Sequence, residues 1–423
     1  MTAQTNDTRS RAGRLIFLCW LMYLISYFGK VNYSATINQV MEFYHVDKPQ
    51  AGMVPTFFFF AYGIGQVVNG LLSRHYNIKW TVFGALTASA AINLTIAVSA
   101  NFAIVKWLWM VNGFVLSLLW PLVVRLLAES LPQKDLTRSS IIMSTPVAIG
   151  TLGIYAFSAL FVAVGSFKLS FYTAAAADFA IAMIWLMVYG TSVRAAKQER
   201  GQDQQPVQTE QQAQQQKTPG MDLRMVRAMT WFLCLFAVGG NLIKDGLTTW
   251  VPTVLKEEYA LADSISILLT LLLPITAIFG AAFAGYLHKK VPDYVTHCFV
   301  SFMAMAVFMG VILGGLRWRQ AVVLLLAMIV VAYLASSVNN LITSMYPIIM
   351  STHLNAGRTA GILNGCCYLG STISAYGLGV VAEHYGWDGV FRLLLGVCLL
   401  GGVIWGCYCA VCRWYQWNKG TIL

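Results

Sequence analysis

Lys30 lies well inside the first apolar stretch of the chain, 15–40. A charged side chain at the centre of a bilayer-spanning helix costs about 2.5–3.5 kcal/mol on insertion scales, so a lysine there usually has a function. Tyr23, Tyr27 and Ser34 are separated from Lys30 by helical intervals, which predicts that all four side chains share one face. A cation within a row of hydroxyl groups indicates the wall of a polar cavity that receives an anion.

Lys244 is a second lysine inside an apolar stretch, 228–255. Asn241 and Thr248 lie on the same helical face at i−3 and i+4. Asp245 follows Lys244 directly, and because helical neighbours at i and i+1 do not face each other, no ion pair between them is predicted. Two lysines at corresponding places in two halves of the chain predict a pair that binds one anionic group. The alternative is that each lysine reaches the membrane interface or pairs with a carboxylate.

Asp178 lies in the middle of another apolar stretch, 169–190. A carboxyl group inside a membrane is either a proton carrier or a hydrogen-bonded structural group. The sequence leaves both interpretations open. If Asp178 titrates, the protein is a proton symporter.

Further polar side chains recur at helical spacing in three other apolar stretches. They could contact a substrate or form hydrogen bonds between helices. The members of these rows are Tyr62 and Gln66; Asn339, Thr343 and Tyr346; and Asn364, Tyr368 and Ser371.

The composition is that of a protein that crosses a membrane many times. Of the 423 residues, 58% are hydrophobic and 11% are charged, and the mean hydropathy is +0.64. A soluble domain carries about 25% charged residues. The net charge of +11 is typical of Lys and Arg on cytoplasmic loops and does not require a nucleic-acid partner. No metal cluster or nucleophile motif is evident, so we expect neither an enzyme nor a cofactor.

The apolar stretches predict twelve spans, with a Gln-rich cytoplasmic linker after the sixth. The fold class is therefore an all-α membrane protein with two pseudo-symmetric six-helix bundles, at 1–190 and 225–423, joined by the linker 191–224. Lys and Arg are concentrated on the loops that share a side with the N-terminus, so both termini are expected in the cytoplasm. The predicted spans are 15–40, 51–73, 80–100, 104–130, 140–165, 169–190, 228–255, 264–287, 294–315, 320–350, 359–382 and 389–412.

This plan is that of a major facilitator, a transporter whose site lies between two bundles near the midplane. Two segments also resemble the organophosphate:phosphate antiporter family. The first is Lys30-Val31-Asn32-Tyr33, and the second is the run KDGLTTWVPT from Lys244, followed by Leu255, Lys256 and Glu257. The family includes the glycerol-3-phosphate and hexose-phosphate transporters. Further likeness is carried by Tyr62, Trp120, Pro121, Arg125, Tyr368, Trp387 and Asp388.

The resemblance implies that Lys30 and Lys244 stand where the family has its two substrate arginines. The family's next lysine is replaced by Val31, a lysine in its second span by Gln66, and a histidine in its fifth span by Pro146. Arginine binds phosphate bidentately, whereas lysine is a compact charge with rotatable donors. A monoanionic carboxylate, or a phosphate ester with additional polar groups, therefore suits this chain better than a dianion held by arginines.

We expect a monomeric, multi-pass transporter of the cell (inner) membrane that moves a small organic anion by alternating access. By resemblance the anion is a phosphate ester, exchanged for phosphate. The alternatives are a proton-coupled symporter of a carboxylate or sugar acid and, in another class, a nutrient sensor that does not transport. The expected substrate-binding residues are Lys30, Lys244, Tyr23, Tyr27, Asn32, Tyr62, Gln66, Asn241, Asn364 and Tyr368, with Asp178 as the proton-coupling candidate.

Overall fold

The structure, a computed structural model, describes residues 2–132, 145–202, 223–350 and 356–418, and also residues 135, 139, 142 and 143. Within these residues every regular element is a helix, which confirms the all-α fold class. Most of the predicted linker, 203–222, lies outside the described residues. The first part of the predicted linker, 191–202, is helical, because α10 (Lys168–Gln202) continues beyond the predicted end of the sixth span.

The chain divides into two compact units. Unit 1 comprises Met1–His45, Phe57–Glu210 and Asp263–Leu271, and unit 2 comprises Val46–Thr56, Gln211–Ala262 and Leu272–Leu423. The first turns of α4 thus belong to unit 2, and α12 belongs to unit 1. The division into bundles at 1–190 and 225–423 stays a prediction.

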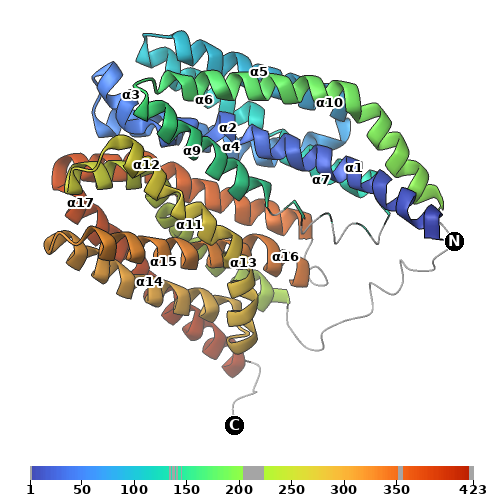
Figure 1. Ribbon diagram of the computed structural model, residues 1–423. Coiled ribbons are helices and arrows are strands. Elements are labelled where there is room, and N and C mark those ends of the chain that lie inside the picture. Colours follow the sequence, from blue (N-terminus) through green and yellow to red (C-terminus); the bar gives the residue numbers. More distant parts are fainter. Residues whose placement is uncertain are drawn as a thin grey trace. The chain divides into compact units, whose positions relative to one another are not determined.

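Unit 1 contains the helices of the first predicted span, most of α4, the elements that follow it up to α10, and α12. In Figure 1, α5 runs beside α10. The elements are α1 (Thr2–Ser26), α2 (Phe28–Ala35), α3 (Ile37–Tyr44), α4 (Lys48–Leu72), the 3-10 helix η1 (Ser73–His75), α5 (Ile78–Val98), α6 (Phe102–Leu116), α7 (Leu119–Ser130), α9 (Pro146–Ala163), α10 (Lys168–Gln202) and α12 (Asp263–Thr270).

Unit 2 is built around α11, which packs mainly against α17 and α15, and α14 lies beside α15 (Figure 1). Its elements are α11 (Leu223–Tyr259), α13 (Leu272–Lys290), α14 (Tyr294–Arg317), α15 (Ala321–Asn340), the π-helix η2 (Leu341–Met345), α16 (Tyr346–Ile349) and α17 (Ala356–Asn418).

Helix ends are fixed by local chemistry. Asn77 begins α5 and Asn101 begins α6, each accepting a hydrogen bond from a backbone N–H of the first turn. Asp293 does the same for α14, at 2.7 Å from the Thr296 nitrogen. Pro146 starts α9, where its missing N–H costs nothing.

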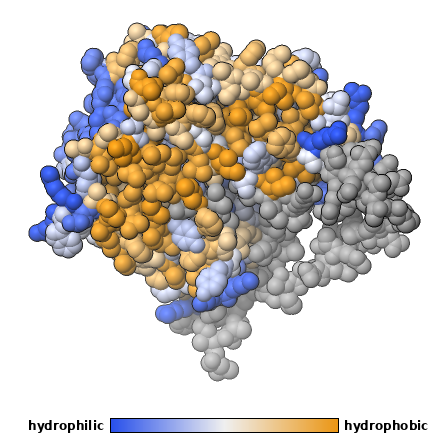
Figure 2. Space-filling model, viewed as in Figure 1, coloured by the Kyte–Doolittle hydropathy of each residue, from blue (hydrophilic) through white to orange (hydrophobic). Residues whose placement is uncertain are grey.

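Ten described helices are long and apolar enough to cross a membrane by length and composition. One of them, Thr359–Tyr415, corresponds to the last two predicted spans, because Gly386 at φ 66° interrupts α17. The eighth predicted span is divided between α12 and α13. Large apolar side chains such as Leu71 and Trp231, 74% and 70% exposed, lie on the outside of the helices, and apolar residues cover much of the face in Figure 2. This outward surface suits contact with lipid.

An apolar cluster in unit 1 joins α1, α2, α9, α10 and α12, with α2 packed against α9 and α10 and with α12 packed against α9. Its buried members are Leu24, Phe28, Ala35, Ile154, Tyr155, Ala159, Ala174 and Ile267. The first predicted span is therefore held on one side by apolar packing, which leaves its other faces for polar groups.

Candidate functional site

Lys30 lies on α2, a segment of eight residues that follows α1 through Tyr27, whose backbone is still helical, and that ends at Thr36. The sequence analysis predicted one continuous span here, and the structure shows three helical segments. Thr36, at φ −115° and ψ 22°, leaves the helical conformation, and its hydroxyl donates to the carbonyl of Asn32 at 2.9 Å. Interrupted helices inside membranes occur where the backbone is buried in protein or lines a cavity, as in transporter binding sites.

The ammonium group of Lys30 lies among aromatic rings of unit 1. Its Nζ is 3.9 Å from the centre of the Tyr62 ring, 4.8 Å from that of Tyr27 and 5.9 Å from that of Phe58. Tyr23 contacts the Tyr27 ring edge-on, with centroids 5.6 Å apart. We call Lys30, Tyr27, Phe58 and Tyr62 the ring cluster. It keeps a cation inside the unit through attraction to the ring faces, worth about 0.5–2 kcal/mol per favourable contact.

The opposite face of α2 meets a buried polar network. The carboxylate of Asp178, fully buried on α10, accepts a hydrogen bond from Ser89 on α5 at 2.7 Å. Asn32 donates to Asn93 at 2.9 Å, and both amides are fully buried. Gly29 allows this approach, since a Cβ there would collide with Asp178. Asn32, predicted to line the substrate site with Lys30, therefore has its amide in this network.

Asp178 has two candidate roles, and the geometry bears on both. Its Oδ2 is bound by Ser89, and its Oδ1 has no hydrogen-bond partner. A fully buried carboxyl group in such a setting is either protonated or strongly destabilising. The contact with Gly29 also makes Asp178 a positioning residue, because it fixes how closely α10 approaches the helix that carries Lys30.

Gln66 lies one turn beyond Tyr62 on α4. Its Nε2 donates to the carbonyl of Ser117 at 3.3 Å, and the neighbouring Asn69 donates to the Ser117 hydroxyl at 2.8 Å. These bonds join α4 to the end of α6. The hydrogen bond from the partly buried Gln66 to Ser117 therefore links two helices of unit 1.

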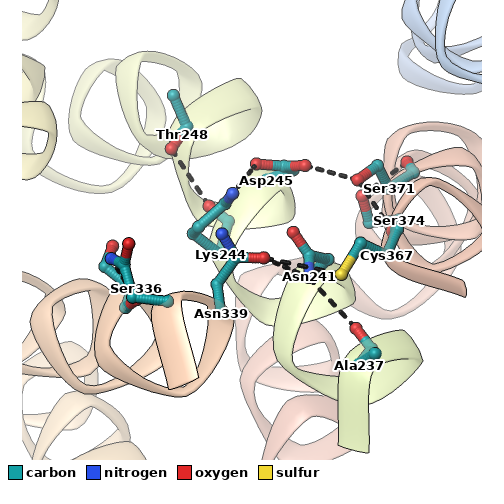
Figure 3. Close-up of polar contacts among 11 residues, drawn as sticks. Ala237, Asn241, Lys244, Asp245, Thr248, Ser336, Asn339, Cys367, Ser371 and Ser374 are labelled. Atoms are coloured by element: carbon teal, nitrogen blue, oxygen red, sulfur yellow. Dashed lines mark hydrogen bonds and ion pairs between the residues drawn. The ribbon is translucent and has the colours of Figure 1, made fainter. Parts of the chain in front are cut away.

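Lys244 has different surroundings in unit 2 (Figure 3). Its Nζ lies 3.3 Å from Oδ1 of Asp245, and the two side chains are 27% and 19% exposed. The other carboxylate oxygen, Oδ2, accepts a hydrogen bond from Ser371 on α17. The inference that adjacent residues would not pair is wrong here, because the flexible lysine side chain bends back to its neighbour's carboxylate. Asp245 thereby joins α11 to α17.

The row predicted around Lys244 has its polar groups in contact with neighbouring helices and backbone (Figure 3). Asn241 donates to the carbonyl of Ala237 and to Oδ1 of Asn339 on α15, both at 3.1 Å. Thr248 donates to the carbonyl of Lys244 at 3.0 Å. A π-helix, η2, follows directly after Asn339 and Asn340, and such segments are frequent at functional sites.

Two further predicted residues, Asn364 and Tyr368, lie on α17 within two turns of Ser371, and both are partly buried. Gly370 beside them packs against the backbone of Val238 on α11, so close that a Cβ would collide with the Val238 carbonyl. This tight contact brings the polar face of α17 to Asp245.

Residues 19–375 match the family model of the Major Facilitator Superfamily. The chain belongs to this superfamily. It is thus a membrane transporter by family, and its expected fold is confirmed. The membrane in which it lies and the side on which its termini lie stay predictions.

Curated relatives of this facilitator are distant. It is 26% identical over 110 residues to the membrane sensor protein UhpC of Escherichia coli (strain K12), covering 26% of this chain and 25% of the relative. It is 23% identical over 116 residues to a probable hexose phosphate transport protein of Chlamydia pneumoniae, covering 27% and 26%. The match thus spans about a quarter of each relative's length.

Solved structures of other facilitators share the fold. A bacterial homologue of the human lysosomal transporter Spinster, inward-facing and occupied, aligns with TM-score 0.71 at 11% identity over 95% of this chain and 97% of that one. The nucleoside transporter NupG aligns with TM-score 0.68 at 15% identity over 94% and 98%. At these identities the likeness concerns the fold alone.

Several residues that carried the family resemblance have architectural contacts in this facilitator. Trp250 donates to the carbonyl of Ala375 at 3.1 Å, and Trp387 donates to Glu257 at 2.8 Å. Arg125 pairs with Glu129 at 2.7 Å, as its spacing predicts, and also donates to the carbonyl of Ser73. These motif residues hold helices together in their own units.

Sequence reasoning did not predict the ion pair between Asp245 and Lys244. The available signal was an acid beside a lysine inside an apolar span, which is rare enough to warrant attention. Ser371 was recognised only as part of a polar row. In the part of the chain that the structure describes, no cluster of three His, Cys, Asp or Glu side chains could hold a metal ion.

Proposed function

We propose that this facilitator transports a small organic anion by alternating access, with Lys30 and Lys244 binding the anionic group. The observation that carries this proposal is the ring cluster. Lys30 Nζ is held 3.9 Å from the Tyr62 ring within unit 1, on an interrupted helix, and so is not extended toward a membrane interface. A cation held inside an apolar bundle is expensive, and anion binding gives it a use.

The proposed substrate is a phosphate ester, such as a hexose phosphate, and the family resemblance implies that it is exchanged for phosphate. Support comes from the probable hexose phosphate transport proteins among the curated relatives and from the positions of the two lysines. The remaining predicted residues that shape the site are Tyr23, Tyr27, Tyr62, Gln66, Asn241, Asn364 and Tyr368. The protein is proposed to act as a monomer in the cell membrane.

The test uses purified protein in liposomes loaded with phosphate. Labelled phosphate should exchange for external hexose phosphate in wild type, and Lys30→Gln should reduce the rate by about tenfold to a hundredfold, the loss of one charge-assisted contact. Lys168→Gln is the matched control, since Lys168 also lies over a ring, that of Phe43 at 4.2 Å, at the start of α10. Wild-type exchange that Lys30→Gln leaves unchanged would remove Lys30 from the site.

A proton-coupled symporter of a carboxylate or sugar acid is the second candidate. The observation in its favour is the full burial of Asp178, with one oxygen bound only by Ser89. Uptake driven by a pH gradient, without phosphate inside, and its loss in Asp178→Asn would support this function. If Asp178→Asn retains gradient-driven uptake, Asp178 is the structural group that positions α2.

A third candidate is a sensor that binds ligand without moving it. The curated relative from Escherichia coli that bears the name membrane sensor protein favours it. Ligand-induced thermal stabilisation together with no flux in liposomes would support a sensor. Measurable flux would exclude it.

A further inference from the structure

We propose that Asp245 is an intramolecular counter-ion for Lys244 that makes this half of the site selective for singly charged anions. This inference rests on the proposed function, because it concerns the same substrate group. It assigns to Asp245 a specificity role that neither the motif resemblance nor the polar rows predicted.

The first step is the contact itself. Lys244 Nζ and Asp245 Oδ1 are 3.3 Å apart in the partly buried interior of unit 2 (Figure 3). The pair has no net charge. An anion that approaches Lys244 therefore meets an ammonium group whose field is largely cancelled by the neighbouring carboxylate, and it must share or replace that carboxylate.

The second step is that the carboxylate is held in place from another helix. Ser371 on α17 donates to Oδ2 of Asp245, and the same hydroxyl lies 3.1 Å from the carbonyl of Cys367. Gly370 seats α17 against α11 beside this contact. Asp245 is thus anchored at one oxygen while the other faces Lys244, so it stays close when a ligand arrives.

The third step concerns the other groups packed around the carboxylate. On α11 the charged neighbour is Lys244, and on α17 the titratable neighbour is the thiol of Cys367, which itself lies 3.5 Å from Oδ1 of Asn339 on α15. A bound anion experiences attraction from Lys244 and repulsion from Asp245 at similar range.

The consequence for selectivity follows from Coulomb's law. A second negative charge on the ligand doubles both its attraction to Lys244 and its repulsion from Asp245, and it also costs more to remove from water. Because the charges of Lys244 and Asp245 nearly cancel, the attraction and the repulsion that the ligand's second charge adds nearly cancel too. The cost of removing that second charge from water then decides the difference in affinity. A dianion is therefore disfavoured relative to a monoanion of the same shape.

The experiment compares two probes of nearly identical shape and different charge, glucose 6-phosphate and glucose 6-sulfate, at pH 7.5. The phosphate monoester is mainly a dianion there because its second pKa is about 6, whereas a sulfate monoester carries one charge. Dissociation constants are measured by thermal shift and by calorimetry on the full-length protein in detergent.

Wild type should bind the sulfate ester more tightly than the phosphate ester. Asp245→Asn keeps the shape and an oxygen for Ser371, and it should shift the ratio of the two affinities toward the phosphate ester by about tenfold. Asp388→Asn is the matched control, since Asp388 also pairs with a cation, Arg392 at 2.8 Å, but in an exposed position. It should leave the ratio unchanged.

Two outcomes overturn the inference in distinguishable ways. If wild type binds both probes and Asp245→Asn leaves their ratio unaltered, Asp245 does not set charge selectivity, and the proposed transport function stands. If wild type binds neither probe at millimolar concentration, the proposed substrate class fails, and the inference fails with it. A folded Ser371→Ala variant provides a second measure, because releasing Asp245 from α17 should change the same ratio in the same direction, but by less.

Discussion

Lys30 and Lys244 occupy matching places in the two halves of the sequence, yet the structure surrounds them with different chemistry. Lys30 lies against aromatic rings, and Lys244 lies against a carboxylate. A ring face attracts a cation without cancelling its charge, whereas a carboxylate cancels it. The two units thus surround their lysines differently: unit 1 places aromatic rings beside the ammonium group, and unit 2 places a carboxylate there.

The helices that carry the two lysines differ as well. Lys30 lies on an eight-residue segment that ends at the break at Thr36, and Lys244 lies within the 37-residue helix α11. Four predictions test the comparison of the two lysines and their surroundings, in order of expected effect.

The largest effect is expected from Lys244→Met. Removing one partner of a buried pair costs about 3–5 kcal/mol, and partial exposure of this pair reduces the expected loss to roughly 2–3 kcal/mol. The double variant Lys244→Met with Asp245→Asn should recover most of it, as judged by thermal unfolding in detergent. Lys30→Met should be nearly neutral, because methionine packs well on rings. Equal losses at both lysines would contradict the comparison.

The next effect concerns the close contact between Gly29 on α2 and Asp178 on α10. Gly29→Ala introduces a methyl group that collides with Asp178, Ser89 and Asn93 and should cost about 1–3 kcal/mol of stability, as overpacking does. Gly84→Ala on α5 is the control, because a Cβ there meets nothing within 4 Å. Thermal unfolding of both variants is the measurement. A Gly29→Ala protein as stable as Gly84→Ala would show that α2 does not depend on this contact.

A smaller effect is expected from the ring cluster. Tyr62→Leu removes the ring nearest to the Lys30 ammonium and should weaken anion binding by about fivefold, or about 1 kcal/mol. Tyr62→Phe retains the ring and should lose less than half of that. Binding measured by calorimetry decides the matter. If Phe and Leu weaken binding equally, the hydroxyl of Tyr62 rather than its ring supports the site.

The smallest effect is expected at the exposed pair of Arg392 and Asp388, whose side chains are 72% and 53% exposed. Asp388→Asn should change the unfolding free energy by less than about 1 kcal/mol, the usual range for surface pairs. This value calibrates the Lys244 result, since the two pairs differ mainly in burial. A loss as large as that of Lys244→Met would show that burial is not what makes the Lys244 pair important.

Much of the fold was predictable from the sequence. Long apolar stretches specify membrane helices because the backbone must satisfy its own hydrogen bonds in lipid, and the family model confirms the superfamily. Helical spacing also predicted that Tyr23, Tyr27 and Lys30 share one face, and the contacts of Tyr27 with Tyr23 and with Lys30 agree with it. These are local relations, and local periodicity determines them.

The partners of the site residues were not predictable in the same way. Nothing in the spacing indicates that Asn32 bonds to Asn93, that Asp178 meets Ser89 and Gly29, or that Ser371 on α17 reaches Asp245. These contacts join helices that are distant in sequence. Their geometry depends on how closely the helices pack, for which small residues such as Gly29 and Gly370 provide the room.

The sequence by itself determined that two cations lie inside apolar helices, because each charge is evident against its neighbours. The tertiary structure alone decided what each cation contacts. Lys30 meets rings contributed by Tyr27 and by α4, while Lys244 meets Asp245 anchored from α17. The physical reason is that charge is a property of the residue, whereas the field around it is set by side chains that only folding brings together.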